Sequence, residues 1–317
     1  MKKPTSEQLA EFFGTWKTKL SKCLEPEMQC DGSPIRAHSV QNARILDLLQ
    51  ASGHVIAPSI RFGVDGPQIT FDSIGRNNAT TFTGLCSVHD ANIFAPIDNA
   101  AFDKRNEQQL FLFAYRAVTR ELHTCMEGAV RIQLGYKSRV DRGIDPKDVP
   151  SAAGQLATEH LIKAFLTYQY REKYFDEPLM AKNYGTLTHD VLTFENQSPV
   201  IAVSSLFSLG WNEMKDDVTC VALNVFPTDD KHTSVIFSYA QPDRTPARAA
   251  LDRILTSSGD YQKYELSKTI LHHCENFVLN PKWFNAWSNK KVKAIHDAFC
   301  ASLSGENIKD DPDLMLF

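Results

Sequence analysis

Apolar residues recur every three to four positions in several segments, a spacing typical of helices that bury one face. The pattern predicts helices over residues 5–22, 41–50, 86–94, 104–135, 155–180, 245–257, 260–278 and 287–303. Thr5 and Ser6 provide capping positions for the first of these segments. The clearest periodicity belongs to 104–135, so we expect a long helix in the first half of the chain.

Strand patterns occur in two parts of the chain. Residues 53–84 alternate between apolar and polar side chains and contain turn signals, which predicts short strands. Three later segments, 198–208, 218–226 and 233–240, are rich in β-branched and aromatic residues and are separated by turn-forming stretches. The expected fold class is α+β, with long helices in an N-terminal module and a C-terminal antiparallel β-meander packed with helices.

A boundary is expected near residue 150. The segment 144–154 contains Pro146 and Pro150 and is the best linker in the chain. At 317 residues the chain exceeds what one hydrophobic core usually fills. We therefore expect two domains, 1–150 and 151–317, of which the second has no recognisable role.

Charge and hydropathy argue against two classes of protein, those that coat nucleic acid and those that span a membrane. The net charge is −4, with 18 basic and 17 acidic side chains in 1–150 against 16 and 21 in 151–317. This balance argues against a protein that coats nucleic acid non-specifically, although the first half tolerates a polyanion. No window approaches 18 consecutive apolar residues, and the N-terminus lacks a signal-peptide apolar stretch. The expectation is a cytoplasmic protein without a membrane partner.

The seven cysteines are odd in number and scattered, so they do not form a disulfide framework. Four stand singly in apolar segments and are expected to be small buried residues: Cys125, Cys220, Cys274 and Cys300.

The remaining cysteines lie near histidines at spacings suited to a metal. Cys23 and Cys30 flank a turn with Pro26, and Cys86 precedes His89 by three positions, which places both on one face of a helix's first turn. Thiolates and an imidazole are the ligands of a tetrahedral zinc site, and a knuckle joined to a distant helix start forms a treble clef. Two alternatives stay open. The pairs arise by chance and His89 only caps a helix, or a water or His38 replaces Cys23.

The segments IRAHSVQN and ATTFTGLCSVHDANIF resemble the HNH (ββα-metal) endonuclease motif over about residues 20–100. The resemblance implies that His38 is the general base, that Cys86 is a zinc ligand and that His89 replaces a second cysteine. Asp90 then stands where the family has its last catalytic histidine, and a carboxylate suits Mg²⁺ or Mn²⁺.

The middle asparagine of the motif has no counterpart. The family places it near 81–83, which is Thr-Phe-Thr here, while Asn77 and Asn78 are out of register. Arg36, two residues before His38, either contacts phosphate or is a solvated arginine at a strand edge.

Two functions from different classes follow. The first is a zinc-containing, metal-dependent HNH-like endonuclease that hydrolyses phosphodiesters of DNA or RNA. The second is a non-catalytic, zinc-stabilised binding or regulatory protein whose C-terminal domain binds a protein partner. The segment also resembles zinc modules of uncharacterised bacterial proteins, and a role in phage defence is an analogy only.

A third arrangement lacks structural zinc and uses His38 and His89 as a catalytic metal pair, with the cysteines as core residues.

Three other groups have simpler explanations. The basic run 131–142 suits a helix C-terminus that carries favourable cations, although it could also bind phosphates. His123 and Glu127, four apart, are expected on a solvated helix face. His272 and Asn276 share a helix face in 260–278 but have no identifiable partner ligands.

Overall fold

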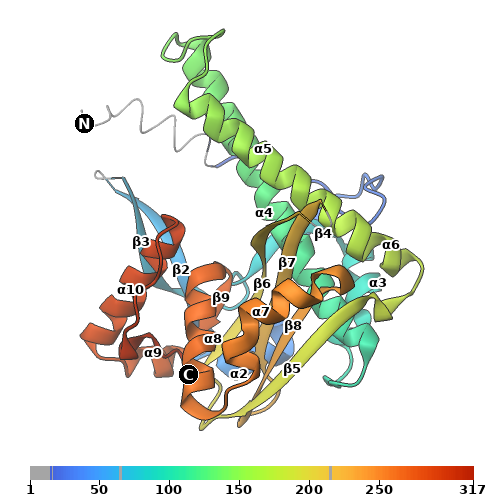
Figure 1. Ribbon diagram of the computed structural model, residues 1–317, viewed down its shortest axis with the longest axis vertical. Helices are drawn as coiled ribbons and strands as arrows, with labels where there is room; N and C mark the ends of the chain where they lie inside the picture. The colour runs from blue at the N-terminus through green and yellow to red at the C-terminus, as the bar shows by residue number, and fades with distance from the viewer. Residues whose placement is uncertain (1–14, 16, 64–65, 214–215) are drawn as a thin grey trace.

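A seven-stranded antiparallel sheet forms the centre of the computed structural model (Figure 1), which describes residues 15, 17–63, 66–213 and 216–317. Its strands in spatial order are β3 (Gly66–Gly75), β2 (His54–Gly63), β9 (Phe277–Leu279), β6 (Ile201–Asn212), β7 (Asp217–Pro227), β8 (His232–Ala240) and β5 (Leu187–Glu195). A second, two-stranded sheet pairs β1 (Pro34–His38) with β4 (Thr81–Cys86), also antiparallel. The expected mixture of helices and antiparallel sheet is confirmed.

Helices cover both faces of the large sheet. On one face lie α4 (Glu107–Asp141) and the two-stranded sheet with the helix that follows it, α3 (Ser87–Asp98). On the other face lie α7 (Arg244–Leu255), α8 (Gly259–His273) and α10 (Asn289–Leu303). The shorter elements are η1 (Asn42–Leu46), α2 (Asp47–Leu49), η2 (Glu172–Asp176), α6 (Glu177–Met180), η3 (Tyr184–Thr186), η4 (Gln241–Asp243), α9 (Pro281–Asn285) and η5 (Pro312–Leu314).

The central strands are apolar on both sides because each face of the sheet meets a helical layer. In β7, Ala222 and Phe226 point to the α4 side, whereas Val221, Leu223 and Val225 point to the α7 and α8 side. This arrangement explains why the strand patterns are continuous apolar runs rather than alternations.

Helix α4 starts where the Asn106 side chain accepts a hydrogen bond from the backbone N–H of Gln109. Its first half is buried on nearly all sides, because it lies between the large sheet and the β1–β4 unit. Its second half runs beside α5 (Ala152–Arg171), away from the sheet (Figure 1). The two expected long helices are therefore present and pack against each other.

Several sequence expectations need correction. The helix expected over 5–22 falls largely outside the described residues, and 17–22 are not helical. Strands β2 and β3 are ten residues each and pair antiparallel along their whole length, where several short strands were expected. Helix α8 ends at His273, and Phe277–Leu279 is instead a strand between β2 and β6. Strand β5 was not predicted.

The expected boundary at residue 150 lies between α4 and α5, and the division into 1–150 and 151–317 stays a prediction. The large sheet takes β2 and β3 from the first part and its other strands from the second. Ile56 of β2 pairs with Leu279 of β9.

Candidate metal centre

Four side chains from separate parts of the chain converge beside the two-stranded sheet. Cys23 and Cys30 lie in the loop before β1, Cys86 is the last residue of β4, and His89 is in the first turn of α3. One ligand atom from each lies within 4.8 Å of the others. The cluster could bind a metal ion such as zinc, and it contains Cys23 but not His38.

Three of the six distances between the ligand atoms are close to those of tetrahedral zinc. The Cys23 and Cys86 sulfurs lie 3.5 and 3.3 Å from His89 Nδ1, and the Cys30 and Cys86 sulfurs are 3.9 Å apart. Bonds of about 2.3 Å to sulfur and about 2.0 Å to nitrogen at a tetrahedral angle separate the ligand atoms by roughly 3.5–3.8 Å. Because three thiols and one imidazole complete four-fold coordination, the donor set is that of a closed structural site.

The loop between Cys23 and Cys30 is folded around one buried carboxylate. Glu25 accepts hydrogen bonds from the backbone N–H groups of Glu27, Gln29 and Cys30, at 2.9, 2.5 and 3.0 Å. Burial raises the pKa of Glu25, but these three donors outweigh burial and hold it below its usual value. The sequence analysis attributed the turn to Pro26 and missed the role of Glu25. The only sequence feature that could have indicated this role is the presence of an acidic residue between the two cysteines.

Backbone groups also support the sulfurs. The backbone N–H of Cys86 donates to Cys23 Sγ across 3.3 Å, and that of Gly32 donates to Cys30 Sγ across 3.2 Å. A Cβ atom on Gly32 would lie 3.2 Å from both Cys30 Sγ and Cys86 Cβ, so a larger residue there would require these neighbours to shift by a few tenths of an ångström. Such outer hydrogen bonds orient metal ligands.

The two buried thiols have different protonation environments. Burial raises the pKa of Cys23 to about 11, whereas the hydrogen bond from the backbone N–H of His89 lowers the pKa of Cys86 to about 7. A bound zinc ion deprotonates coordinating thiols outright, so both thiols fit the role of zinc ligand.

His38 lies at the other end of β1 from the cluster. It pairs with Thr81, whereas Pro34 at the start of β1 pairs with Cys86. The half-buried imidazole places Nε2 3.2 Å from the backbone oxygen of Arg76. Because a carbonyl only accepts, Nε2 carries the hydrogen in the neutral ring, and Nδ1 has no hydrogen-bond partner among the described residues. Burial lowers the pKa of His38, and the charges of Arg116 and Arg36 act in the same direction.

An ion pair between the buried Arg116 and the partly exposed Asp98 lies near both predicted catalytic residues. Arg116 of α4 donates to both carboxylate oxygens of Asp98 at 2.9 and 2.7 Å, and its guanidinium lies 4.0 Å from the centre of the Phe94 ring. The charges of Arg116 and Asp98 act on His38 and on Asp90. Burial raises the pKa of Asp90. Sequence reasoning missed Arg116, although a lone arginine within the apolar run of α4 was a signal.

Arg36 is exposed at an irregularity of β1 and donates to the side-chain oxygen of Asn78 across 2.6 Å. The other nearby asparagine, Asn77, accepts a hydrogen bond from the Asn42 side chain at 2.9 Å. Both asparagines are therefore engaged at the surface.

The remaining candidates serve the packing of the chain. His123 is buried, not solvated as expected, and its Nε2 lies 3.2 Å from both Thr83 Oγ1 and the backbone oxygen of Leu20. Glu127 accepts from the backbone N–H of Leu20 at 2.9 Å. This face of α4 holds the segment that leads into Cys23.

The basic run 131–142 is also engaged within the chain. Arg131 Nε donates to the Thr18 backbone oxygen across 2.8 Å, and Lys137 pairs with Asp141 at 2.6 Å.

Of the four cysteines expected to be buried, three are, while Cys300 is partly exposed.

The chain has no match among protein families, curated proteins or solved structures. Among the described residues, no helix combines the length and the apolar character needed to cross a membrane.

Proposed function

We propose that the protein is a zinc-stabilised, metal-dependent phosphodiesterase of the HNH type that acts on DNA or RNA. Zinc at Cys23, Cys30, Cys86 and His89 would fold the β1–β4–α3 unit, and His38 and Asp90 would carry the chemistry. The observation that carries the proposal is the His38 imidazole. Its Nε2 faces the Arg76 backbone oxygen, while its Nδ1 has no partner in the part of the chain that the structure describes.

The arrangement of elements supports the proposal. Strand β4 pairs antiparallel with β1 and runs directly into α3, with Cys86 as the residue before the helix. This is the strand, strand, helix order that the ββα-metal resemblance implies, although residues 39–80 separate the two strands. His38 and Asp90 lie on different members of this unit and share the charged neighbours Arg116 and Asp98.

His38 is suited to act as a general base. The Arg76 oxygen selects one tautomer, and burial lowers the pKa, so the ring is neutral near pH 7. Nδ1 would take a proton from water as the water oxygen bonds to phosphorus. One P–O ester bond then breaks, the leaving oxygen takes a proton from solvent, and His38 returns its own proton to solvent. General base catalysis of this kind contributes roughly 10²–10⁴-fold.

Asp90 would hold the second metal. A divalent cation held there, such as Mg²⁺ or Mn²⁺, would neutralise charge on the phosphate and the leaving oxygen. Asp98 is unsuited to this task because Arg116 occupies both of its carboxylate oxygens. The exposed Arg36 would contact the phosphate backbone, for which it would give up the hydrogen bond to Asn78.

The test is cleavage of plasmid DNA and of RNA with Mg²⁺ or Mn²⁺. The variants are His38→Ala and Asp90→Asn, with His54→Ala as the matched control, since His54 is an exposed histidine whose Nδ1 also faces a backbone oxygen. The proposal expects metal-dependent cleavage that both site variants abolish and that His54→Ala retains, with zinc content and circular dichroism unchanged. No cleavage by wild type, or equal cleavage by His38→Ala, would refute the nuclease.

A second function is favoured by one observation. Asn77 and Asn78, the asparagines nearest the motif's missing position, are both engaged by surface side chains. A non-catalytic, zinc-stabilised binding or regulatory protein needs no such asparagine. This alternative predicts zinc binding and zinc-dependent stability without cleavage of either nucleic acid.

A further inference from the structure

A pocket of about 550 Å³ lies apart from the metal centre, with Glu121 of α4 in its lining. It opens where α5, β6, β7 and the end of α8 meet, and none of the zinc ligands, His38 or Asp90 lines it. Its volume falls in the range of small-molecule sites, roughly 300–1,000 Å³. A site here is therefore independent of the proposed function.

The wall of the pocket is mainly apolar. The apolar lining residues are Ile162 and Leu166 of α5, Leu206 and Phe207 of β6, and Val218 of β7. The His273 ring stacks on Phe207, with ring centres 4.4 Å apart and planes inclined by 12°. Burial lowers the pKa of His273 to about 4, so this ring is neutral at pH 7. The pocket can thus bury the flat or aliphatic body of a ligand.

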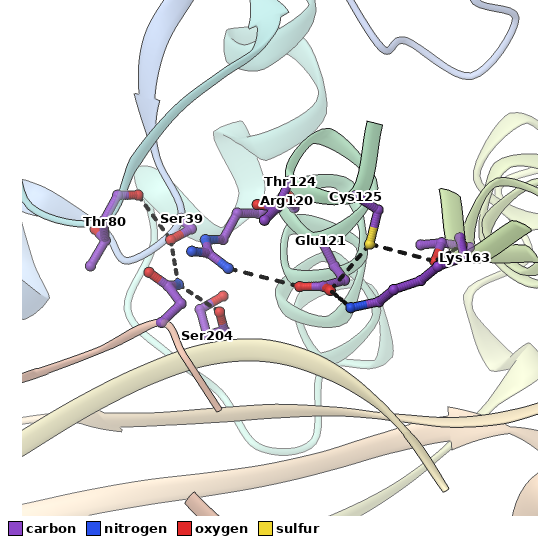
Figure 2. Close-up of polar contacts among 10 residues, drawn as sticks. Ser39, Thr80, Arg120, Glu121, Thr124, Cys125, Lys163 and Ser204 are labelled. Atoms are coloured by element: carbon purple, nitrogen blue, oxygen red, sulfur yellow. Dashed lines mark hydrogen bonds and ion pairs between the residues drawn. The ribbon is translucent and has the colours of Figure 1, made fainter. Parts of the chain in front are cut away.

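Carboxylates outnumber cations at the rim. Glu121 lies between Lys163, at 3.6 Å, and Arg120, at 3.9 Å, with the Cys125 thiol beside it (Figure 2). The other two carboxylates, Glu159 and Glu275, form no ion pair within 4 Å among the described residues. Three carboxylates thus face two fixed cations, which leaves about one negative charge for a ligand to neutralise.

One buried polar group also faces the pocket. Ser205 is 3% exposed, and its hydroxyl has no hydrogen-bond partner among the described residues except the thiol of Cys274. A thiol is a weak hydrogen-bonding group. A buried hydroxyl without a good partner costs free energy, so the Ser205 hydroxyl is available to form a hydrogen bond with a ligand.

We infer that this pocket binds a small organic monocation. Its protonated amine would lie between Glu159 and Glu275, and its aromatic or aliphatic body would pack against the apolar residues of α5 and β6 that line the pocket. A carboxylate or phosphate ligand would instead face the surplus of negative charge.

Isothermal titration calorimetry tests the inference with three matched sets of probes. The amines are phenethylamine and tryptamine, the neutral analogues are 2-phenylethanol and tryptophol, and the acids are 3-phenylpropionate and indole-3-propionate. We expect saturable binding of at least one amine, weaker binding of its alcohol and none of its acid. Absence of saturable amine binding, or equal binding of amine and acid, would overturn the inference.

Substitutions in the pocket test whether the amine binds there. Glu159→Gln combined with Glu275→Gln should weaken amine binding about tenfold. Ile162→Trp, at an exposed position of α5, should block the pocket without disturbing the core. Glu306→Gln, an exposed carboxylate away from the pocket, is the control and should bind as wild type. Unchanged affinity in both pocket variants would mean that the amine binds elsewhere and would overturn the assignment.

Discussion

Asn276 donates a hydrogen bond of 2.8 Å from its side-chain amide to the hydroxyl of Ser39, the residue that follows His38. The same nitrogen donates to the Ser204 backbone oxygen at 2.6 Å, and Ser39 in turn donates to the Thr80 backbone oxygen (Figure 2). One buried amide therefore joins the β1–β4 unit to strand β6 of the large sheet.

Replacing Asn276 with alanine should destabilise the protein. The change leaves Ser39 and the Ser204 carbonyl without their buried partner, at a cost of roughly 2–4 kcal/mol in the free energy of unfolding. Urea denaturation of Asn276→Ala measures the loss. Asn183→Ala, an exposed asparagine, serves as control and should change the free energy by less than about 0.5 kcal/mol. Equal stability of the two variants would contradict the role of this bond.

Arg171 joins the loop between Cys23 and Cys30 to the helical layer. The buried guanidinium donates to the Leu24 backbone oxygen at 2.6 Å and to Asp176 at 3.0 Å. Arg171→Met leaves the Asp176 carboxylate buried without its cation and should cost about 3–5 kcal/mol. Adding Asp176→Asn should recover part of that loss in a double-mutant cycle measured by denaturation. Strict additivity of the two changes would show that the pair does not interact.

Removal of one zinc ligand should remove the metal. The purified protein is expected to contain about one zinc ion per chain. Cys86→Ser should lose it and unfold at a lower temperature, because binding to the folded state is part of the folding free energy. Cys300→Ser, a partly exposed cysteine outside the cluster, should keep its zinc. Elemental analysis and thermal unfolding in chelator measure both effects. A metal-free wild-type protein of undiminished stability would exclude the site.

Glu25 should control zinc affinity without touching the ion. Glu25→Ala removes the acceptor of three backbone N–H groups in the ligand loop. Loss of such outer partners typically weakens metal binding about 10–100-fold. Competition with a chromogenic chelator gives the affinity, and Glu27→Ala, an exposed acid in the same loop, should leave it unchanged.

His189 should make the fold sensitive to acid. Burial lowers its pKa to about 4 in the folded protein, while the unfolded chain takes up the proton near about 6.5. The unfolded state therefore binds more protons as the pH falls through this window, and the stability present above about pH 6.5 is lost. At pH 5 the titration of His189 lowers the free energy of unfolding by at most about 2 kcal/mol relative to neutral pH.

Urea denaturation at pH 7 and pH 5 tests this effect. The stability difference between the two pH values should be smaller for His189→Leu than for wild type. A difference as large as that of wild type would show that other groups cause the acid sensitivity.

Local patterns predicted the elements whose partners lie nearby in the chain. The apolar period of 104–135 predicted α4, and the three β-rich segments predicted β6, β7 and β8, because consecutive antiparallel strands need only a short turn between them. The spacing of Cys86 and His89 predicted two ligands on one face of a helix's first turn. His89 lies in the first turn of α3, but Cys86 is the extended residue that precedes the helix.

The tertiary structure decided what depends on distant contacts. Phe277–Leu279 continues an apolar helix pattern, yet it is a strand because the gap between β2 and β6 offers backbone hydrogen-bonding groups on both sides. His123 has the pattern of a solvated face but is buried, because the segment around Leu20 crosses it.

The four residues of the candidate metal cluster were identifiable from residue type and spacing alone, because cysteine thiolates and histidine imidazoles are the usual ligands of structural zinc. Their convergence to within 4.8 Å, and the placement of His38 at the opposite end of the same strand, required the pairing of β1 with β4 across residues 39–80. Closing a loop of that length costs entropy that no local pattern records, and packing against α4 and the large sheet has to offset it.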